Sequence, residues 1–217
     1  MKIVAIKYGE SVFGESNIYK GGNKDRVLPI SFVIYLIQIE GKNILVDAGF
    51  DDCAGFEMSI FKESYKILEE YGVKTDDITD VILTHCHHDH VEAVWRYNKA
   101  KIHIQKDEYD LTKNYIPKDF NVNIFENEYA LTERVRVKKI GGHSKGSSIV
   151  LADNYVLCGD ECYMRNCLTD NIMTGSSYCE EKSQEFLNKY SDEKYKPLLF
   201  HDPEIMKGKI GYMVIKL

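Results

Sequence analysis

Short apolar runs separated by turn residues make up most of the chain, and this pattern predicts many strands and few helices. Residues 32–39 and 44–47 are rich in β-branched and aromatic side chains, and the turn residues 40–43 between them predict a hairpin. At the N-terminus the alternation is interrupted by Lys7, so a short strand broken at that lysine is expected. The same criteria predict further strands at 81–84, 101–105, 135–137, 148–151 and 155–157, and a last strand that begins at 197–200.

Helical spacing is confined to two segments. Within 57–71, apolar side chains recur every three or four positions as far as Tyr71, and Gly72 follows as a stop signal. Residues 180–190 have the second helical pattern. The order of the elements predicts an α/β protein with two similar halves, each of which is a sheet with helices on its outer face.

Composition narrows the class of protein. The 217 residues carry 28 Lys and Arg against 34 Asp and Glu, which gives a net charge of −6, and 44% of the residues are hydrophobic. These values predict one globular domain over residues 1–217 and exclude disorder, collagen and coiled coil. The acidic balance argues against nucleic acid or an anionic membrane as a partner and leaves a small molecule as the expected substrate.

The expected cellular compartment rests on three sequence features: apolar runs, the N-terminal pattern and the number of cysteines. No apolar run approaches the roughly 20 residues of a membrane span, and the N-terminus has no signal-peptide pattern. Six cysteines over this length are too few for a disulfide scaffold. A cytoplasmic protein with reduced thiols is therefore expected.

The strongest chemical signal is the segment 84–90, which reads Thr-His-Cys-His-His-Asp-His. His85 and His87 are two positions apart, so on an extended segment that leaves a strand their imidazoles lie on one side. Asp89 and His90 follow as the chain turns, and they add an oxygen donor and a nitrogen donor. Mixed donors at this spacing are typical of a site for a borderline divalent cation such as zinc.

Three more polar residues stand at predicted strand ends. His143 lies among glycines in 141–146, Asp160 follows an apolar strand, and His201 follows another. Each position alone is typical of an ordinary strand end, although a buried carboxylate at Asp160 would be costly without a cation beside it. Together with the dense histidine cluster, the three residues predict one metal-binding constellation.

In this order the residues resemble the metallo-β-lactamase superfamily of hydrolases. The resemblance extends from about residue 30 to His201 and includes the stretches 44–50, 76–85, 104–110 and 156–160. It implies a four-layer αβ/βα sandwich of two mixed sheets with two Zn²⁺ at one edge, iron or manganese being the alternative metals. It also implies that His85, His87 and His143 bind one metal and that Asp89, His90 and His201 bind the other. Asp160 would bridge the two metals.

The chain departs from the family pattern at two places. Val91 and Glu92 stand where the family usually has small glycines, which leaves open that Glu92 reaches the cleft. Gly142 stands where the family often has Pro-Gly before the histidine, which is a mild change. Residues 9–29 are polar and contain glycine, and their position suggests a loop over the site.

A closer resemblance is to the N-acyl homoserine lactonase-like group. Tyr163 lies three residues after Asp160, as in that group, and residues 200–204 are also similar. The resemblance implies that a metal-bridging hydroxide attacks a carbonyl and that Tyr163 donates a hydrogen bond to the lactone or the leaving alkoxide. The predicted function is hydrolysis of a lactone or related carboxylic ester, with Asp89, Asp160 and Tyr163 as catalytic residues and Tyr163 as the substrate-binding one.

Other functions stay open on the same ligands: a thioesterase, a phosphodiesterase, a di-iron oxidoreductase or a non-catalytic ligand-binding protein. A β-lactam substrate is disfavoured because His90 and Asp160 are both present, and His87 favours zinc because the flavin-linked di-iron enzymes carry Glu there. Too few residues follow Asp160 for the helical substrate domain of glyoxalase II-like enzymes. An acidic chain without a basic run gives little support for an RNA substrate.

Other cysteine, histidine and aspartate residues are not expected to bind the metals directly. Cys86 and His88 alternate with the ligands, so their side chains are expected to point away from the metals. His103 lies in an alternating strand and is expected to be exposed. Cys162 is a core residue or lines the cleft, and Asp47 is either a plain turn residue or one that orients a ligand.

Overall fold

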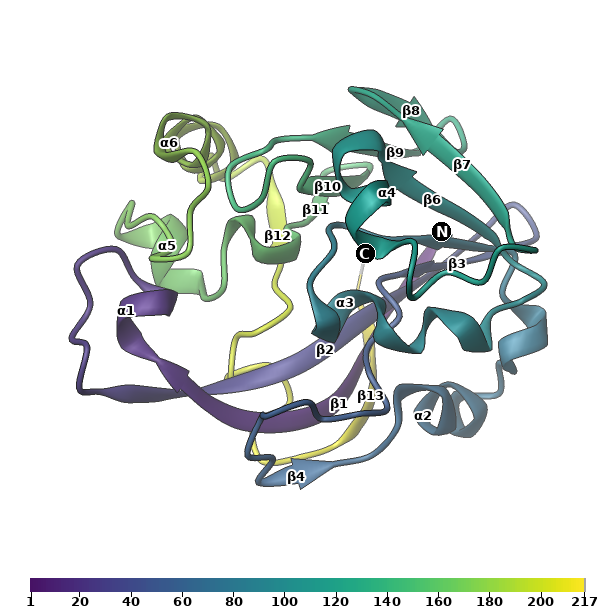
Figure 1. Cartoon of the computed structure of the whole chain (residues 1–217), viewed down its shortest axis with the longest axis horizontal. Coiled ribbons are helices and arrows are strands. Elements are labelled where there is room, and N and C mark those ends of the chain that lie inside the picture. Colours follow the sequence, from purple (N-terminus) through teal and green to yellow (C-terminus); the bar gives the residue numbers. More distant parts are fainter. Residues whose placement is uncertain (217) are drawn as a thin grey trace.

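Two β-sheets packed face to face organise the chain in the computed structural model, which describes residues 1–216 (Figure 1). The first sheet has eight strands in the order β13-β1-β2-β3-β5-β6-β7, and β4 pairs with β1. Its members are β1 (Lys2–Gly14), β2 (Val27–Ile39), β3 (Lys42–Val46), β4 (Ile60–Phe61), β5 (Asp80–Ile82), β6 (Lys101–Gln105), β7 (Asn121–Phe125) and β13 (Gly211–Ile215).

The second sheet has five strands in the order β12-β11-β10-β9-β8. They are β8 (Glu128–Ala130), β9 (Val135–Lys139), β10 (Ser148–Ala152), β11 (Tyr155–Leu157) and β12 (Lys196–Leu198). Both sheets are mixed, because β3, β5, β6 and β7 run parallel in the first and β11 pairs parallel with β12 in the second.

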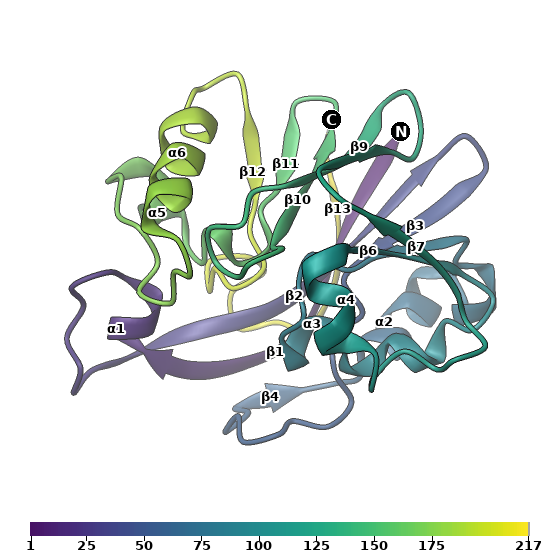
Figure 2. The same cartoon turned by 45° about the horizontal axis from the view of Figure 1, so that its top comes forward.

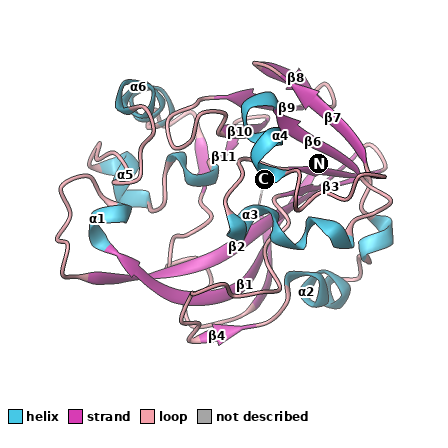
Figure 3. Ribbon diagram, in the orientation of Figure 1, coloured by secondary structure: helices cyan, strands magenta, loops and turns pink. Residues whose placement is uncertain are grey.

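The longer helices lie on the outer faces of the two sheets, with the strands between them (Figures 2 and 3). The helices are α1 (Glu15–Ile18), α2 (Ser64–Tyr71), α3 (His88–Val91), α4 (Lys106–Thr112), α5 (Arg165–Thr169) and α6 (Glu180–Tyr190), with short 3₁₀ turns at Thr75–Asp77, Glu92–Arg96 and Gly159–Glu161. Among the described residues, none of the helices has both the length and the apolar run that a bilayer crossing needs.

Three apolar layers separate the four layers of structure, and β1 shows how the sequence builds them. Ile3 and Ala5 point into the layer between the sheets, whereas Val4 and Ile6 point into the layer between the first sheet and its helices. The third layer lies between the second sheet and α6, around Phe186. Because alternate strand residues face opposite sides, a strand covered on both faces is apolar at every position, as the run 32–37 is.

The loops that follow four strands meet at one edge of the sandwich. They follow β5, β9, β11 and β12, and backbone bonds join them across the two sheets. Ser148 N–H donates to Thr84 O over 2.9 Å, and Ser31 N–H donates to His201 O over 3.1 Å. This edge therefore collects polar residues that are far apart in the sequence.

The four-layer α/β fold predicted from the resemblance is confirmed, as is the hairpin of β2 and β3, but its turn is only Glu40 and Gly41 because Lys42 and Asn43 pair with β2. That turn holds Glu40 and Gly41 at φ 51° and 74°. The helix 180–190 matches α6, while the helix expected over 57–71 is confirmed only from Ser64, because Ile60–Phe61 pairs with β1 instead. Gly72 ends α2 at φ 96°, as expected from its lack of a side chain.

Two expectations at the N-terminus are wrong. Lys7 does not break the first strand: β1 runs through it to Gly14 with a register shift between Lys7 and Gly9, and the lysine is fully buried. Its ammonium group donates to the backbone oxygens of Ile205 and Met206 and pairs with Glu10, which compensates the charge. Residues 9–29 are mostly not a loop, because Gly9–Gly14 pairs with Val27–Phe32 as a long hairpin arm that carries α1 (Figure 1).

Candidate metal centre

The seven predicted ligands lie together at the edge where the strand ends meet. His85, His87, Asp89 and His90 follow β5, and the other three follow strands of the second sheet: His143 after β9, Asp160 after β11 and His201 after β12. They form two groups of donor atoms, each within 4.8 Å of one another: His85, His87, His143 and Asp160; and Asp89, His90 and His201.

The first group presents three imidazole nitrogens to one point. His87 Nδ1 lies 3.0 Å from His85 Nε2 and 2.9 Å from His143 Nε2. Asp160 Oδ2 completes the group at 3.5 Å from His85 Nε2 and 3.4 Å from His143 Nε2. Donors on a tetrahedral zinc, each about 2.1 Å from the ion, lie about 3.4 Å apart, so these spacings suit one cation.

The second group has the same geometry around the other oxygen of the bridging residue. Asp160 Oδ1 lies 3.1 Å from His90 Nε2 and 3.0 Å from His201 Nε2. Asp89 Oδ2 lies 3.5 Å from each of these two nitrogens. Each Asp160 oxygen therefore faces one group, which is the placement a carboxylate shared by two cations requires.

Hydrogen bonds on the far side of the rings show that the inward atoms are lone pairs. His90 Nδ1–H donates to Asp47 Oδ2 over 2.7 Å, and His201 Nδ1–H donates to Ser31 O over 3.0 Å. His85 Nδ1–H donates to Thr84 Oγ1 over 3.0 Å, since that hydroxyl already donates to Asp47. Each ring then keeps its lone pair on Nε2 and points it into the site.

Lone pairs that face one another at this spacing repel unless a cation lies between them. Asp160 Oδ1 is buried and finds no hydrogen-bond donor among the described residues. An orphaned carboxylate oxygen among imidazole lone pairs is a costly arrangement, and two divalent cations would satisfy it. The donor set of nitrogens and hard oxygens therefore fits zinc and similar borderline ions.

Asp47 holds the base of the site in a constrained backbone conformation. Its φ is 62°, in the left-handed region that few residues other than glycine adopt. In that conformation its two oxygens accept from the backbone N–H and the hydroxyl of Thr84, at 2.7 and 2.9 Å, and from His90. Of the two expectations for Asp47, the structure supports the one in which it orients a ligand.

Two buried glutamates support the ligand loops, and sequence reasoning missed both. Glu161 accepts from the backbone N–H groups of Gly142 and His143, each over 3.2 Å. Glu108 accepts from the N–H groups of Cys86 and Gly146, over 2.9 and 2.6 Å. Glu108 lies in the stretch 104–110 that carried part of the resemblance, so a signal for it was present without an assigned role.

Burial and charge set the protonation of the site. Burial lowers the pKa of His87 to about 4, and it lowers the pKa of His143 well below the usual value. Burial also acts on His90, but the Asp160, Asp89 and Asp47 carboxylates outweigh it and raise the pKa of His90 well above the usual value. Positive charge is therefore disfavoured on the imidazoles of His87 and His143 and favoured on His90, which lies beside the carboxylates.

A pocket of about 310 Å³ opens directly over both groups. Its polar lining includes His87, Asp89, His143, Asp160 and His201, and its apolar lining is Phe13, Ile30 and Phe56. Two of the apolar residues come from the hairpin arm of β1 and β2, so this arm forms a wall of the site.

Tyr163 also lines this pocket, with its ring centroid 5.1 Å from that of His201 and 6.0 Å from that of His143. Burial raises the pKa of Tyr163 well above its usual value, and the Asp160 and Asp89 carboxylates raise it further. The phenol is therefore a hydrogen-bond donor beside both ligand groups, while its contact with substrate stays a prediction.

Two neighbours of the ligand residues are not ligands themselves. Glu92 does not line the pocket; its carboxylate accepts from Asp51 N–H over 2.7 Å and fixes the loop between β3 and β4. His88 lies outside both ligand groups, as expected, although its side chain also lines the pocket. It does so because its Nε2–H donates to Asp52 O over 2.7 Å, which turns the ring towards the cleft.

Two further side chains are buried away from the pocket. Cys162 belongs to the core beside α5 and α6 and does not line the pocket. His103, expected to be exposed, is fully buried on β6 because its Nε2–H donates to Asp80 Oδ1 over 2.9 Å and its ring stacks on Tyr129.

Comparison with known proteins agrees with this architecture. The family described as Metallo-beta-lactamase superfamily matches residues 33–172. An N-acyl homoserine lactonase from Bacillus cereus is 23% identical over 239 residues, which cover 95% of this chain and 95% of the lactonase. The two proteins are thus similar over nearly their whole length.

Two solved structures have the same fold. An N-acyl homoserine lactone hydrolase, solved with the product N-hexanoyl-L-homoserine bound at its catalytic metal centre, superposes with a TM-score of 0.83 at 21% identity, over 98% of each chain. AidC, a dizinc quorum-quenching lactonase, superposes with a TM-score of 0.73 at 18% identity, over 99% of this chain and 94% of its own.

Proposed function

The chain belongs to the metallo-β-lactamase superfamily, and from that premise we propose that it is a dinuclear zinc hydrolase that opens a lactone or a related carboxylic ester. The observation that carries the choice of substrate is the lining of the pocket over the two ligand groups. It combines apolar walls with the hydroxyls of Tyr163 and Ser176, and no lysine or arginine of residues 1–216 lines it. A neutral carbonyl compound suits such a pocket better than a phosphodiester, whose charge calls for a cationic partner.

Divalent cations at the two groups would supply the chemistry that the side chains lack, since they lower the pKa of water and polarise a carbonyl oxygen. The protein residues do the rest. Phe13 and Phe56 exclude water from one side of the substrate, and Tyr163 donates its proton in a hydrogen bond to the carbonyl or ring oxygen.

The proposed reaction consumes one water. A new bond forms between the water oxygen and the carbonyl carbon, and the bond between that carbon and the ring oxygen breaks. The ring oxygen gains one proton in exchange for one that the water loses and becomes a hydroxyl, the carbonyl group becomes a carboxylate, and the second water proton is released to solvent. Asp89 lines the pocket and its Oδ2 faces His90 and His201, so its carboxylate is the group placed to accept a proton that the water loses.

The test is a substrate panel on protein loaded with stoichiometric zinc: N-acyl homoserine lactones of several acyl lengths, simple lactones, aryl esters, thioesters and a phosphodiester. Release of acid is followed in a pH-stat. We expect turnover of lactones and esters and none of the phosphodiester. If the phosphodiester alone reacts, the substrate proposal is wrong; if nothing reacts, a ligand-binding protein is the better description.

Metal identity needs a separate measurement. Elemental analysis of protein purified without added metal is expected to find zinc, close to two ions per chain. Two irons per chain, with oxidase activity and no hydrolysis, would instead indicate an oxidoreductase on the same ligands.

A further inference from the structure

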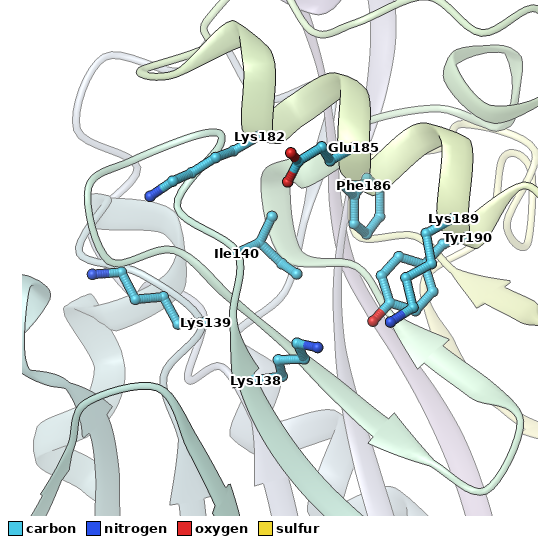
Figure 4. Close-up of a pocket in the computed structure, with 8 residues that line it drawn as sticks. All are labelled: Lys138, Lys139, Ile140, Lys182, Glu185, Phe186, Lys189 and Tyr190. Atoms are coloured by element: carbon cyan, nitrogen blue, oxygen red, sulfur yellow. The ribbon is translucent and has the colours of Figure 1, made fainter.

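A second cleft lies outside the pocket over the ligand groups, between the end of β9 and α6 (Figure 4). It has a volume of about 230 Å³ and shares no lining residue with the pocket over the ligand groups. Its lining consists of four lysines, one glutamate and three apolar or aromatic residues: Lys138, Lys139, Lys182, Lys189, Glu185, Ile140, Phe186 and Tyr190.

The local secondary structure explains why the lysines converge. Lys182, Glu185 and Lys189 are three and four positions apart on α6, so they share one face of the helix. Lys138 enters from β9 on the facing side of the cleft (Figure 4). The lysine side chains thus line one hollow and come from two elements distant in sequence.

Most of this positive charge has no partner. Lys139 pairs with Asp107 of α4, but within residues 1–216 no carboxylate lies within 4.0 Å of the amines of Lys138, Lys182 or Lys189. Elsewhere on the surface lysines with close carboxylates are common, as at Lys106 with Glu126. A chain with a net charge of −6 therefore keeps a local excess of cations around a hollow, where their mutual repulsion is relieved by an anion.

The residues at the base of the cleft indicate what kind of anion the cleft can bind. Phe186 and Tyr190 are each only 2% exposed, so they form a firm base but offer little apolar surface to a ligand. Recognition must then come from charge. Lysine is a compact point charge that pairs well with phosphate oxygens, and three such charges favour an anion with more than one negative charge.

We propose that this cleft is a binding site for a small phosphate-type anion that carries at least two negative charges, separate from the metal centre. Free oligophosphates and the phosphorylated headgroups of lipids share this chemistry. The site takes no part in the hydrolytic reaction, so this proposal and the proposed function are tested independently.

The experiment compares two triple variants of the zinc-loaded protein. K138Q/K182Q/K189Q removes the cleft charges, whereas K24Q/K74Q/K209Q removes three other exposed lysines that have no salt bridge among the described residues. The net charge changes equally in both. Pyrophosphate is titrated by calorimetry at low ionic strength, and vesicles of phosphatidylcholine with and without a phosphoinositide form a second arm.

We expect the cleft variant to lose binding by about tenfold or more, and the control variant to bind like the parent protein. Zinc content is measured in all three, because Lys182 lies beside Gly141 in the loop of His143 and because pyrophosphate also coordinates metal. Binding of vesicles alone, lost in the cleft variant, assigns the phosphate to a lipid headgroup. Equal binding by parent and cleft variant, equal losses in both variants, or no binding in either arm overturns the proposal.

Discussion

Asp160 shows at the scale of one residue how a carboxylate can organise a site. Its Oδ2 faces His85 and His143, and its Oδ1 faces His90 and His201. Burial raises the pKa of Asp160, but the surrounding imidazoles outweigh this effect and hold the pKa well below the usual value. The carboxylate is therefore charged, which suits a ligand placed between two cation sites.

The contacts of Asp47 predict an effect on metal affinity. Asp47→Asn keeps a side chain that tolerates the φ of 62° but replaces the anionic acceptor of His90 Nδ1–H by an amide. We expect zinc affinity to fall about 10–100-fold at the group of Asp89, His90 and His201. Competition with a chromogenic chelator measures it.

Asp153→Asn is a matched control for that variant. Asp153 also has a positive φ, 54°, but lies in an exposed turn where it pairs with Arg134. An exposed pair contributes little, so zinc affinity should match the parent. A comparable loss in both variants would show that Asp47 acts through general stability and not through His90.

The position of Tyr163 predicts that its substitution lowers kcat without changing the zinc content. Tyr163→Phe removes the hydrogen-bond donor but keeps the ring that packs against His201. We expect kcat to fall about 100-fold with zinc content and KM nearly unchanged, because the phenol assists mainly as charge develops on the leaving oxygen. Steady-state kinetics on a lactone tests this, and an unchanged kcat would remove Tyr163 from the mechanism.

At the scale of elements, β5 and β6 are joined by a buried polar cluster that the alternation of the sequence did not reveal. Asp80 on β5 accepts from His103 on β6, from Lys42 on β3 and from Thr79, over 2.8–2.9 Å. Alternation correctly predicted that His103 lies in a strand, but it gave the wrong exposure. The partner that makes burial possible comes from another strand, which a local pattern does not contain.

This cluster predicts how stability depends on pH. Burial raises the pKa of Asp80, but the bonds from His103, Lys42 and Thr79 outweigh it and bring the pKa well below 3.8. The folded state therefore binds the proton more weakly than the unfolded state. Its contribution is complete above about pH 4 and is lost as the pH falls further.

Asp80→Asn should lower the free energy of unfolding by about 3 kcal/mol at pH 7, or roughly 6–12 °C in Tm, and flatten the loss of stability below pH 4. Thermal unfolding between pH 2 and 7 measures both effects. The control is Asp76→Asn, which removes an exposed pair with Lys99 and should change little. An Asp80→Asn protein as stable as its parent at pH 7 would contradict the prediction.

At the scale of the whole molecule, the candidate metal centre joins the two sheets. Four ligands follow β5 of the first sheet and three follow strands of the second. Two bound cations would therefore hold together loops that are otherwise linked by few backbone bonds, such as Ser148 N–H to Thr84 O. Metal that binds only the folded state adds to its stability by mass action.

Metal removal should consequently lower Tm. At free zinc about 100 times the dissociation constant, each site adds about 2.7 kcal/mol, so stripping both should lower Tm by about 10–20 °C. Differential scanning calorimetry before and after dialysis against a chelator tests this, and readdition of zinc should restore the original value. A Tm that does not respond to the chelator would mean that the ligand loops are held by protein contacts alone.

The amino-acid sequence by itself determined the strand-rich α/β class, the helix at 180–190 and the set of residues that the structure gathers at one edge. It could do so because strand alternation, helix spacing and closely placed histidines are local patterns. Only the tertiary structure decided that Lys7 and His103 are buried, that Phe13 and Ile30 of the hairpin arm form a wall of the pocket and that His88 lines it. Each of these depends on a partner distant in sequence, and such partners are brought close only when the two sheets pack.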